Sequence, residues 1–453
     1  MNYELKYNLA KPLACRRLWC AIVTLILHFS LFTFHSFAQV SSTNSTYSRF
    51  GLGLLHDQSQ GFNKSMGGIG LGVRIGNRIN TTNPASYSAI DSLSILLDVG
   101  MSGSFGQMRQ GTQSVKVKSA SLDYIHAGMH IAKRLGLAVG FMPYTSIGYQ
   151  FASPETVITN DANTTQKISY SNIYSGSGGI NQAYIGLGWR VYRDLSIGAN
   201  VSLIWGQYSH LLVPYYMDGG TSSNSYSSTI KGYYASLKTY KLDFGAQYPV
   251  RLSSQDWLNL GVTVGLGHKF AQDATLLIYS TKGDSTSFTA TTPFDLPYSF
   301  GVGAAWQHKN TLVVGADMHH ERWGNCRMPV ETSNAYVPMK GGYKNMTKIA
   351  VGAQWTPDPF DKRYWKRIQY RIGANYTTPY LKVDGKDGPK EIRLTVGAGL
   401  PITNRLNNRS VVNFGVQWLR RSSSAAGMVK EDYLLINLGM TFNERWFMKY
   451  KIE

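Results

Sequence analysis

The chain has 453 residues, of which 46 are glycine and 29 are tyrosine, and only 16% are charged. Its formal net charge is +19 and its mean hydropathy is −0.20. A chain this polar is not a helical membrane protein. A low mean hydropathy does not exclude a membrane β-barrel, because half of each strand faces a polar interior.

Residues 1–38 predict a signal peptide. Four basic side chains precede an apolar run at 18–34, and Ser36 and Ala38 supply small side chains at the positions that a signal peptidase reads. We therefore expect cleavage after Ala38, with an uncleaved membrane anchor as the alternative. Cys15 and Cys20 lie before or within the apolar run, which is the wrong place for a lipoprotein cleavage site.

The expected mature chain keeps a single cysteine, Cys326, so it cannot form a disulfide within itself. After residue 38 no stretch has the apolar length that a membrane-spanning helix requires. An exported chain of this kind is either soluble in the periplasm or outside the cell, or it is a barrel in the outer membrane of a Gram-negative bacterium.

Residues 39–92 are rich in serine, asparagine and glycine and do not follow the alternation of a strand. A barrel of about fourteen strands has a lumen wider than the eight-stranded kind that side chains fill, and narrower than the open channels of larger barrels. We therefore predict that 39–92 form an N-terminal plug, or hatch, inside the lumen.

Residues 93–442 repeatedly alternate apolar and polar side chains, as between Leu195 and Trp205, where one face is apolar and the other is mainly serine, glycine and asparagine. This repetition predicts an all-β fold, a transmembrane antiparallel β-barrel of about 14 strands. The expected strands are 93–105, 116–132, 135–150, 178–192, 194–210, 232–249, 257–271, 296–308, 311–320, 346–356, 368–378, 391–400, 410–420 and 432–442.

The connections between these strands alternate in length, as in bacterial barrels with short periplasmic turns and longer outer loops. This pattern places the N- and C-termini in the periplasm, with 443–453 as a basic and aromatic periplasmic tail. The longer connections are expected at 106–115, 151–177, 211–231, 272–295, 321–345, 379–390 and 421–431, and the shorter ones at 133–134, 193, 250–256, 309–310, 357–367 and 401–409.

A soluble β-sandwich also alternates and also has turns. Its solvent face carries long charged side chains, however, whereas the polar face here carries mainly glycine, serine, asparagine, glutamine and threonine. The barrel is therefore the favoured interpretation, and outer-membrane lipids and lipopolysaccharide, not nucleic acid, are the expected partners of the positive charge.

Several segments resemble the FadL/TodX family of outer-membrane transporters for long-chain fatty acids and hydrocarbons. The run 67–72 is similar to part of the family's N-terminal hatch, and 137–144 resembles an early strand. The run 294–303 resembles a strand entry in Bacteroidota-type relatives. The hatch resemblance rests on Gly67, Gly68, Gly70, Asn83, Pro84 and Ala85.

The resemblance implies fourteen strands around a plug, with hydrophobic small molecules captured outside and released sideways through the barrel wall. An opening needs a kinked strand, and Gly136, Gly140, Pro143 and Gly148 in the third strand are candidates for it. Each of these glycines could instead simply fit the curved wall. A fatty-acid carboxylate would meet Arg371 or Arg393, which both have inward parity, although such arginines more often pair with acidic side chains.

The sequence offers no catalytic constellation, metal site or cofactor motif that we favour. Asp317, His319 and Glu321 share one strand face, which could form a metal site, but a histidine hydrogen-bonded at the rim is the commoner arrangement. The glycine run at 68–72 lacks the βαβ context of a nucleotide fingerprint. We therefore expect the chain not to be an enzyme.

Basic residues gather at the predicted periplasmic end, where Tyr364 and Trp365 would serve as anchors to phospholipid headgroups. The same charge could bind an acidic partner. It therefore supports a second hypothesis, in which the barrel transports nothing and is a subunit of an outer-membrane protein assembly or secretion complex. The basic set includes Lys133, Arg134, Arg251, Lys362, Arg363, Lys366, Arg367, Arg405 and Arg409.

Overall fold

The computed structural model describes residues 44–92, 94–159, 167–216, 229–280, 283–402, 410–425 and 427–445. The expected signal peptide, the turn arginines Arg405 and Arg409, and all but 443–445 of the expected tail lie outside these ranges. Among the described residues no helix is long and apolar enough to cross a membrane.

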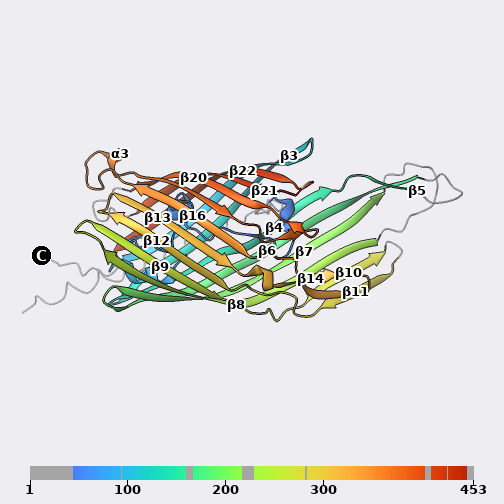
Figure 1. The fold of residues 1–453 in the computed structure, drawn as a ribbon, viewed down its shortest axis with the longest axis horizontal. Coiled ribbons are helices and arrows are strands. Elements are labelled where there is room, and N and C mark those ends of the chain that lie inside the picture. Colours follow the sequence, from blue (N-terminus) through green and yellow to red (C-terminus); the bar gives the residue numbers. More distant parts are fainter. Residues whose placement is uncertain are drawn as a thin grey trace, which may run out of the picture. The chain divides into compact units, whose positions relative to one another are not determined.

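The described chain forms a closed antiparallel barrel of fourteen strands (Figure 1). Each strand pairs with its neighbours in chain order, and the last strand closes the ring by pairing with the first from Ser94↔Arg445 to Arg109↔Lys430. All fourteen predicted strands are confirmed. They are β2 (Ser94–Gln110), β3 (Gln113–Ala132), β4 (Leu135–Ala152), β6 (Lys167–Tyr192), β7 (Leu195–Tyr216), β8 (Thr229–Arg251), β9 (Asp256–Leu266), β12 (Ser299–His308), β13 (Leu312–Glu321), β16 (Met346–Trp355), β17 (Gln369–Thr377), β20 (Lys390–Pro401), β21 (Val411–Ser422) and β22 (Lys430–Arg445).

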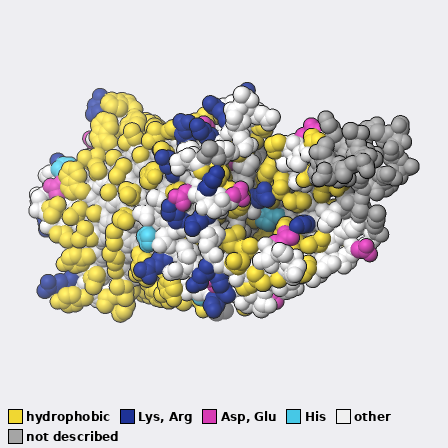
Figure 2. Space-filling view, turned by 45° about the vertical axis from the view of Figure 1, so that its right-hand side comes forward, with side chains coloured by type: hydrophobic (Ala, Val, Ile, Leu, Met, Phe, Trp, Pro, Cys, Tyr) yellow, Lys and Arg dark blue, Asp and Glu magenta, His cyan; other side chains and the backbone are white. Residues whose placement is uncertain are grey.

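The alternation in the sequence becomes an apolar outer face and a polar inner face. In β7, Ile197 and Val201 are 43% and 51% exposed, whereas Ser196 and Ser202 are buried. Figure 2 shows hydrophobic side chains gathered over the left-hand part of the surface. Exposed apolar side chains at this density mark a surface that meets lipid, because a soluble protein rarely leaves so large a patch in water.

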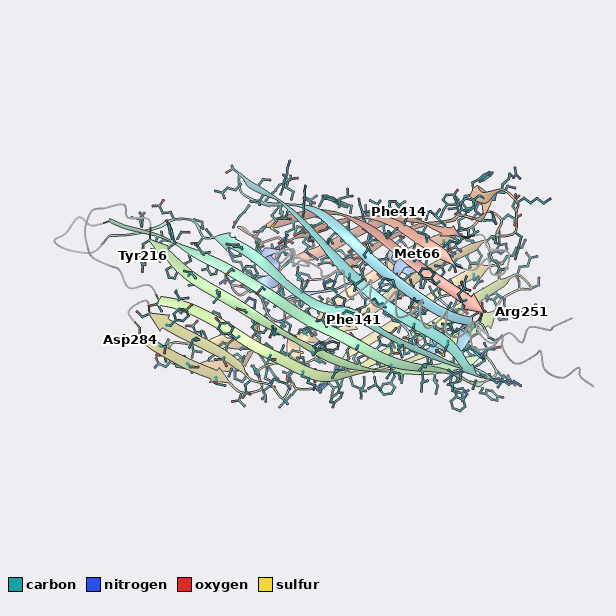
Figure 3. All side chains as sticks on the ribbon, turned by 180° about the vertical axis from the view of Figure 1, so that it is seen from behind. Met66, Phe141, Tyr216, Arg251, Asp284 and Phe414 are labelled. Carbon is teal, nitrogen blue, oxygen red and sulfur yellow. The ribbon has the colours of Figure 1, made fainter. Side chains whose placement is uncertain are left out.

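The two ends of the barrel differ in the length of their connections. One end, here called the turn end, has short connections at 133–134, 193–194, 252–255 and 309–311, and a longer one at 356–368 that contains α3 (Tyr364–Arg367). The other, the loop end, carries the longer segments, and Figure 3 shows Arg251 at the turn end and Tyr216 and Asp284 at the loop end. The loop end includes β5 (Thr156–Thr159), β10 (Ala274–Ser280), β11 (Ser285–Ala290), η3 (Trp323–Asn325), β14 (Arg327–Glu331), β15 (Tyr336–Lys340), β18 (Lys382–Val383) and β19 (Lys386–Asp387).

Several predicted boundaries were wrong; for example, β6 begins at Lys167, eleven residues before the predicted start at 178. The connection expected at 106–115 is a two-residue turn, because β2 continues to Gln110 and β3 begins at Gln113. Beyond the apolar belt both faces of this hairpin meet solvent, and β2 no longer alternates apolar and polar side chains there. At the other end of the chain, β22 continues to Arg445 and includes the first residues of the expected tail.

The loop end has a hydrophobic core of its own. Trp323, Phe270 and Phe294 are fully buried there, and they cluster with Ile204 of β7 and Leu276 of β10. In this half of the barrel β8 pairs with β10 along Thr229–Ala235. The loop end is therefore packed by aromatic and aliphatic side chains.

Candidate functional site

The barrel wall has a gap in its hydrogen bonding between β3 and β4. These strands pair only from Ile125↔Phe141 to Ala132↔Leu135, in the half nearer the turn end. Beyond Phe141, which Figure 3 labels, β4 stays paired with β6 on its other side, and β3 stays paired with β2. The two strands thus part towards the loop end.

The gap coincides with an irregularity in β4. Its register with β6 shifts between Pro143 and Thr145, which is the signature of a β-bulge at Tyr144. On the facing strand, Gly178 and Gly179 have φ angles of 125° and 149°. A bulge bends its strand, so this is where β4 turns away from β3.

The residues predicted to open the wall have different surroundings. Pro143 lies at the irregularity itself. A Cβ on Gly136 would lie 1.9 Å from the Tyr87 carbonyl oxygen, and one on Gly140 would lie 2.2 Å from Nδ1 of His126. Gly148 accepts a hydrogen bond from a backbone N–H and donates one to a serine hydroxyl. A role of these four residues in opening the wall stays a prediction.

Part of the chain that precedes the barrel runs along the free edge of β4. We call residues 44–92 the N-terminal segment; it contains η1 (Thr46–Arg49), β1 (Leu54–Leu55), α2 (Gly61–Lys64) and η2 (Pro84–Ala89). Strand β1 pairs with β4 through Leu54↔Ser146 and Leu55↔Thr145.

Further hydrogen bonds extend this pairing towards both strands. The Ser45 N–H donates to the Gly148 carbonyl at 3.1 Å, and the His56 N–H donates to the Tyr144 carbonyl at 3.0 Å. On the other side, Nδ2 of Asn44 donates to the Lys118 carbonyl of β3 at 2.7 Å. Residues 44–56 therefore contact both strands that border the gap.

The rest of the N-terminal segment packs against glycines of the barrel wall. Met66, labelled in Figure 3, is fully buried, and its carbonyl oxygen lies 2.2 Å from where a Cβ of Gly352 would stand. Only glycine permits so close an approach of two backbones. Similar contacts below 3 Å involve wall glycines Gly136, Gly188, Gly198, Gly245, Gly261, Gly303, Gly373, Gly397 and Gly415.

The hatch-motif residues hold this packing in place. Gly67 and Gly68 have φ angles of 68° and 82°, and the Gly70 N–H donates to Oδ2 of Asp317 on β13. Nδ2 of Asn83 donates to the carbonyls of Leu71, at 2.9 Å, and Ala246 of β8, at 3.1 Å. Oδ1 of Asn83 caps η2 by accepting from the Ala85 N–H, and Pro84 is the first residue of that helix.

A chain of buried and half-buried charges ties the N-terminal segment to four strands. Asp57 lies between Lys348 of β16 and Arg393 of β20. Arg421 of β21 contacts Glu391 of β20 and Glu431 of β22. Glu431, which is fully buried, accepts a hydrogen bond from the Ser45 hydroxyl at 2.7 Å. A second buried pair joins Lys64 to Asp123 of β3.

Burial and the neighbouring charges determine whether His56 and Asp57 of the segment are ionised. Burial raises the pKa of Asp57, but the Lys348 ammonium and the Arg393 guanidinium outweigh it and hold that pKa below its ordinary range. Burial lowers the pKa of His56 to about 4. The segment therefore presents an ionised Asp57 and a neutral His56 at neutral pH, and Nε2 of His56 lies 3.0 Å from the Ser146 hydroxyl of β4.

The two arginines expected to meet a ligand carboxylate already have partners. The Arg371 guanidinium donates to three side-chain amide oxygens, of Gln354 at 2.8 Å, Asn413 at 2.7 Å and Gln369 at 2.6 Å. Arg393 contacts Asp57. The sequence missed Asp57, because it lies in an irregular segment that shows no pattern. The inward position of Lys348 in β16 was a signal that could have indicated an acidic partner inside the barrel.

Three cavities surround residues 54–59. The largest is about 200 Å³, and its lining includes Met142 and Tyr144 together with His319, Glu321 and the Lys241–Asp243 ion pair. The other two are about 100 Å³ and 80 Å³. The second borders the gap, and its lining includes Ser102, Ser104, Ser119, Ser121 and Asp123 of β2 and β3, Ser146 of β4, and Leu419, Tyr433 and Leu435 of β21 and β22.

The acidic and histidine side chains singled out in the sequence are engaged with neighbours. Asp317 accepts from the N–H groups of Gly70 and Leu71, and Glu321 lies 3.3 Å from His319 and accepts from Nε1 of Trp323. Within the described ranges no group of three or more histidine, cysteine or acidic side chains is placed to hold a metal ion.

The fold is that of FadL-type β-barrels. Three solved structures share the fold: the toluene transporter TodX of Pseudomonas putida, the toluene transporter TbuX of Ralstonia pickettii, and a FadL homologue of Pseudomonas aeruginosa. Their sequence identities are 15%, 14% and 13%, and their TM-scores are 0.54, 0.53 and 0.56. The matches cover 86%, 84% and 87% of this chain and 100%, 96% and 99% of the respective structures.

The chain belongs to the BamG family, whose model matches residues 21–453. No curated protein matches the chain. The predicted FadL/TodX-like fold is thus confirmed, while the family is one that carries a different name.

Proposed function

We propose that this protein is a closed outer-membrane barrel that serves as a subunit of an outer-membrane protein assembly complex and passes no substrate. Membership in the BamG family supports this role. The observation that carries it is the ion chain that fastens Ser45 and Asp57 of the N-terminal segment to β16, β20, β21 and β22. It runs from Glu431 through Arg421, Glu391 and Arg393 to Asp57 and Lys348.

In this proposal the N-terminal segment is a permanent plug. Its backbone approaches the wall glycines too closely to slide, and β1 pairs with the edge of β4 beside the gap. Removing one partner from a buried ion pair leaves an uncompensated charge, which is strongly unfavourable. Release of the plug would break several such pairs at once, so the N-terminal segment remains bound inside the barrel.

The chemistry of the gap also argues against a hydrocarbon path. The cavity beside it is lined on β2 and β3 by four serines and Asp123, and Arg393 and Arg421 face it from other strands, although Leu54, Leu55, Leu419 and Leu435 also contribute to the lining. Small-molecule sites for apolar ligands are lined mainly by apolar side chains. An apolar molecule would displace water from these polar groups without replacing their hydrogen bonds, which costs free energy.

A second candidate function is the uptake of hydrophobic, fatty-acid-like molecules with lateral release through the wall. It is favoured by the parting of β3 and β4 beyond Phe141, and by the cavity that Leu55, Met142 and Tyr144 line near the bulge. The related folds of TodX and TbuX are described as toluene transporters. In this alternative the segment would have to leave the edge of β4 during each transport cycle.

Depletion of the protein in its native host separates the two functions. An assembly subunit predicts that other outer-membrane barrels fall in abundance and that their unfolded precursors accumulate in the periplasm, whatever carbon source is supplied. An uptake barrel predicts normal levels of these proteins and a growth defect confined to media in which a fatty acid or hydrocarbon is the carbon source. Normal barrel levels after depletion would refute the proposed function.

A further inference from the structure

Three turn tips at the turn end place basic side chains in a strained backbone conformation. Arg134, Arg193 and Lys309 have φ angles of 70°, 49° and 49°. They are three of the five non-glycine residues with positive φ in the described ranges, and all three are exposed. Glycine or asparagine adopts this conformation at lower cost and is the usual choice in two-residue hairpin turns.

Strain at an exposed position needs a compensating reason, and the shared property of these three residues is positive charge. They lie on the turns that join β3 to β4, β6 to β7, and β12 to β13. Glycine would adopt this conformation at a lower free-energy cost, so the positive charge at each of these positions comes with a backbone cost.

Aromatic side chains accompany the basic ones at the same end. The Arg193 guanidinium lies 5.3 Å from the ring centre of Tyr192, and that of Arg251 lies 5.7 Å from the ring centre of Trp257. In α3 and its flank, Arg363 lies 5.7 Å from the ring centre of Trp365, which is 53% exposed. Amphipathic rings beside cations are the arrangement that membrane proteins place at the boundary between hydrocarbon and headgroups.

These groups are distributed around the barrel. The turns that carry them follow one another from β3–β4 through β6–β7, β8–β9 and β12–β13 to β16–β17, which is more than half of the ring. Acidic neighbours balance only part of the charge: Asp361 contacts Arg363 and Lys366, Asp256 contacts His308, and Asp194 follows Arg193 in its turn. A folded protein partner would contact one arc of such a ring, whereas a planar layer of anionic headgroups contacts all of it.

We infer that the turn-end rim is a binding surface for anionic phospholipid headgroups, with Arg134, Arg193 and Lys309 as charges held at its turn tips. Phosphate groups approach these side chains from the leaflet that surrounds the turn end, and the adjacent aromatic rings lie at the same boundary. The attraction is electrostatic and acts near the surface, within the screening distance of the medium. It is independent of whether the barrel transports a substrate.

The test compares the full-length protein in lipid nanodiscs of phosphatidylcholine alone and of an equal mixture of phosphatidylcholine and phosphatidylglycerol. The turn-tip variant combines Arg134→Gly, Arg193→Gly and Lys309→Gly. A charge-matched control combines Lys340→Asn, Lys386→Asn and Lys390→Asn, which removes three exposed charges from the loop end. Thermal unfolding and the amount of phosphatidylglycerol that stays bound in detergent are measured for each protein.

We expect phosphatidylglycerol to raise the Tm of the wild type and of the control, and the turn-tip variant to lose at least half of that rise and most of the retained lipid. In phosphatidylcholine alone the turn-tip variant should be at least as stable as the wild type, because glycine relieves the strain. Equal responses of the turn-tip variant and the control would overturn the inference. So would an unchanged lipid response combined with loss of a stoichiometric protein partner from native membranes, which would assign the rim to a protein.

Discussion

Arg393 of β20 donates a hydrogen bond from Nη1 to Oδ2 of Asp57, a residue 336 positions earlier in the chain. Both side chains are about nine-tenths buried. This contact fixes the N-terminal segment to the barrel at the level of the wall gap, so it is the natural place to test whether the segment is a permanent part of the wall.

Replacement of Asp57 by asparagine should loosen the N-terminal segment. Asp57→Asn leaves Arg393 and Lys348 without the buried negative charge that compensates them, at a cost of about 3 kcal/mol. Hydrogen exchange of residues 44–58 should become faster while the strands keep their protection. Asp387→Asn is the matched control, because it breaks the half-exposed pair with Lys344 and should cost less than about 1 kcal/mol. Equal exchange of 44–58 in the two variants would show that the ion chain does not hold the segment.

Acidification should also release the segment. The folded pKa of His56, about 4, is below the ordinary value of 6.5. The stabilisation is therefore complete above pH 6.5 and is lost as the pH falls from 6.5 towards 4, because protonation then favours the unpacked state. The charged groups that act on His56 are Asp123, Lys64, Arg421 and Asp57.

Limited proteolysis of residues 44–58 at a series of pH values measures this effect. Cleavage of the wild type should rise between pH 6.5 and pH 4, and His56→Gln, which cannot gain a proton, should flatten that rise. A wild-type profile that is already flat across this interval would contradict the assignment of His56 as its cause.

Close backbone packing predicts a strong effect of single methyl groups. Gly136→Ala and Gly352→Ala each place a Cβ within 2.2 Å of a carbonyl oxygen of the N-terminal segment, and overpacking of this kind costs about 1–3 kcal/mol. Gly103→Ala in β2 is the control, since nothing lies within 4 Å of its Cβ. The first two variants should have a lower Tm than the third. Similar Tm values for all three would mean that the N-terminal segment shifts to accommodate the added methyl groups at little cost.

A disulfide between β1 and β4 distinguishes a static plug from a moving one. Leu55 and Thr145 are paired residues of β1 and β4, so Leu55→Cys with Thr145→Cys, in a Cys326→Ser background, should oxidise to a bond. A permanent plug predicts that the bonded protein supports outer-membrane protein assembly as well as the reduced form does. Loss of activity on oxidation, restored by reduction, would instead show that the segment has to leave β4.

The strands were predictable from sequence because each has one face against lipid and one against a polar interior. The outer part of the β2–β3 hairpin was not, because solvent meets both of its faces and β2 shows no alternation after Phe105. The short hairpins β10–β11 and β14–β15 were missed within the predicted loops, where part of their side chains pack into a local cluster at the loop end.

The candidate site was predictable only in part. The glycine run at 67–72 marked a close approach of backbones, which the contacts of Met66 and Gly352 illustrate. The partner of Arg393, Asp57, depends on how residues 44–59 run across the interior, and no local pattern encodes a contact between residues more than 300 positions apart. The inward position of Arg371 was predictable, but its three amide partners were not.

Isolation of the protein from its native outer membrane in mild detergent, followed by measurement of the mass and composition of the intact particle, tests the assembly role most directly. We predict a particle in which this chain is present in fixed stoichiometry with other outer-membrane assembly proteins, and in which the barrel holds no fatty-acid-like molecule. A lone barrel that carries a bound hydrophobic ligand would contradict the proposed function and favour uptake.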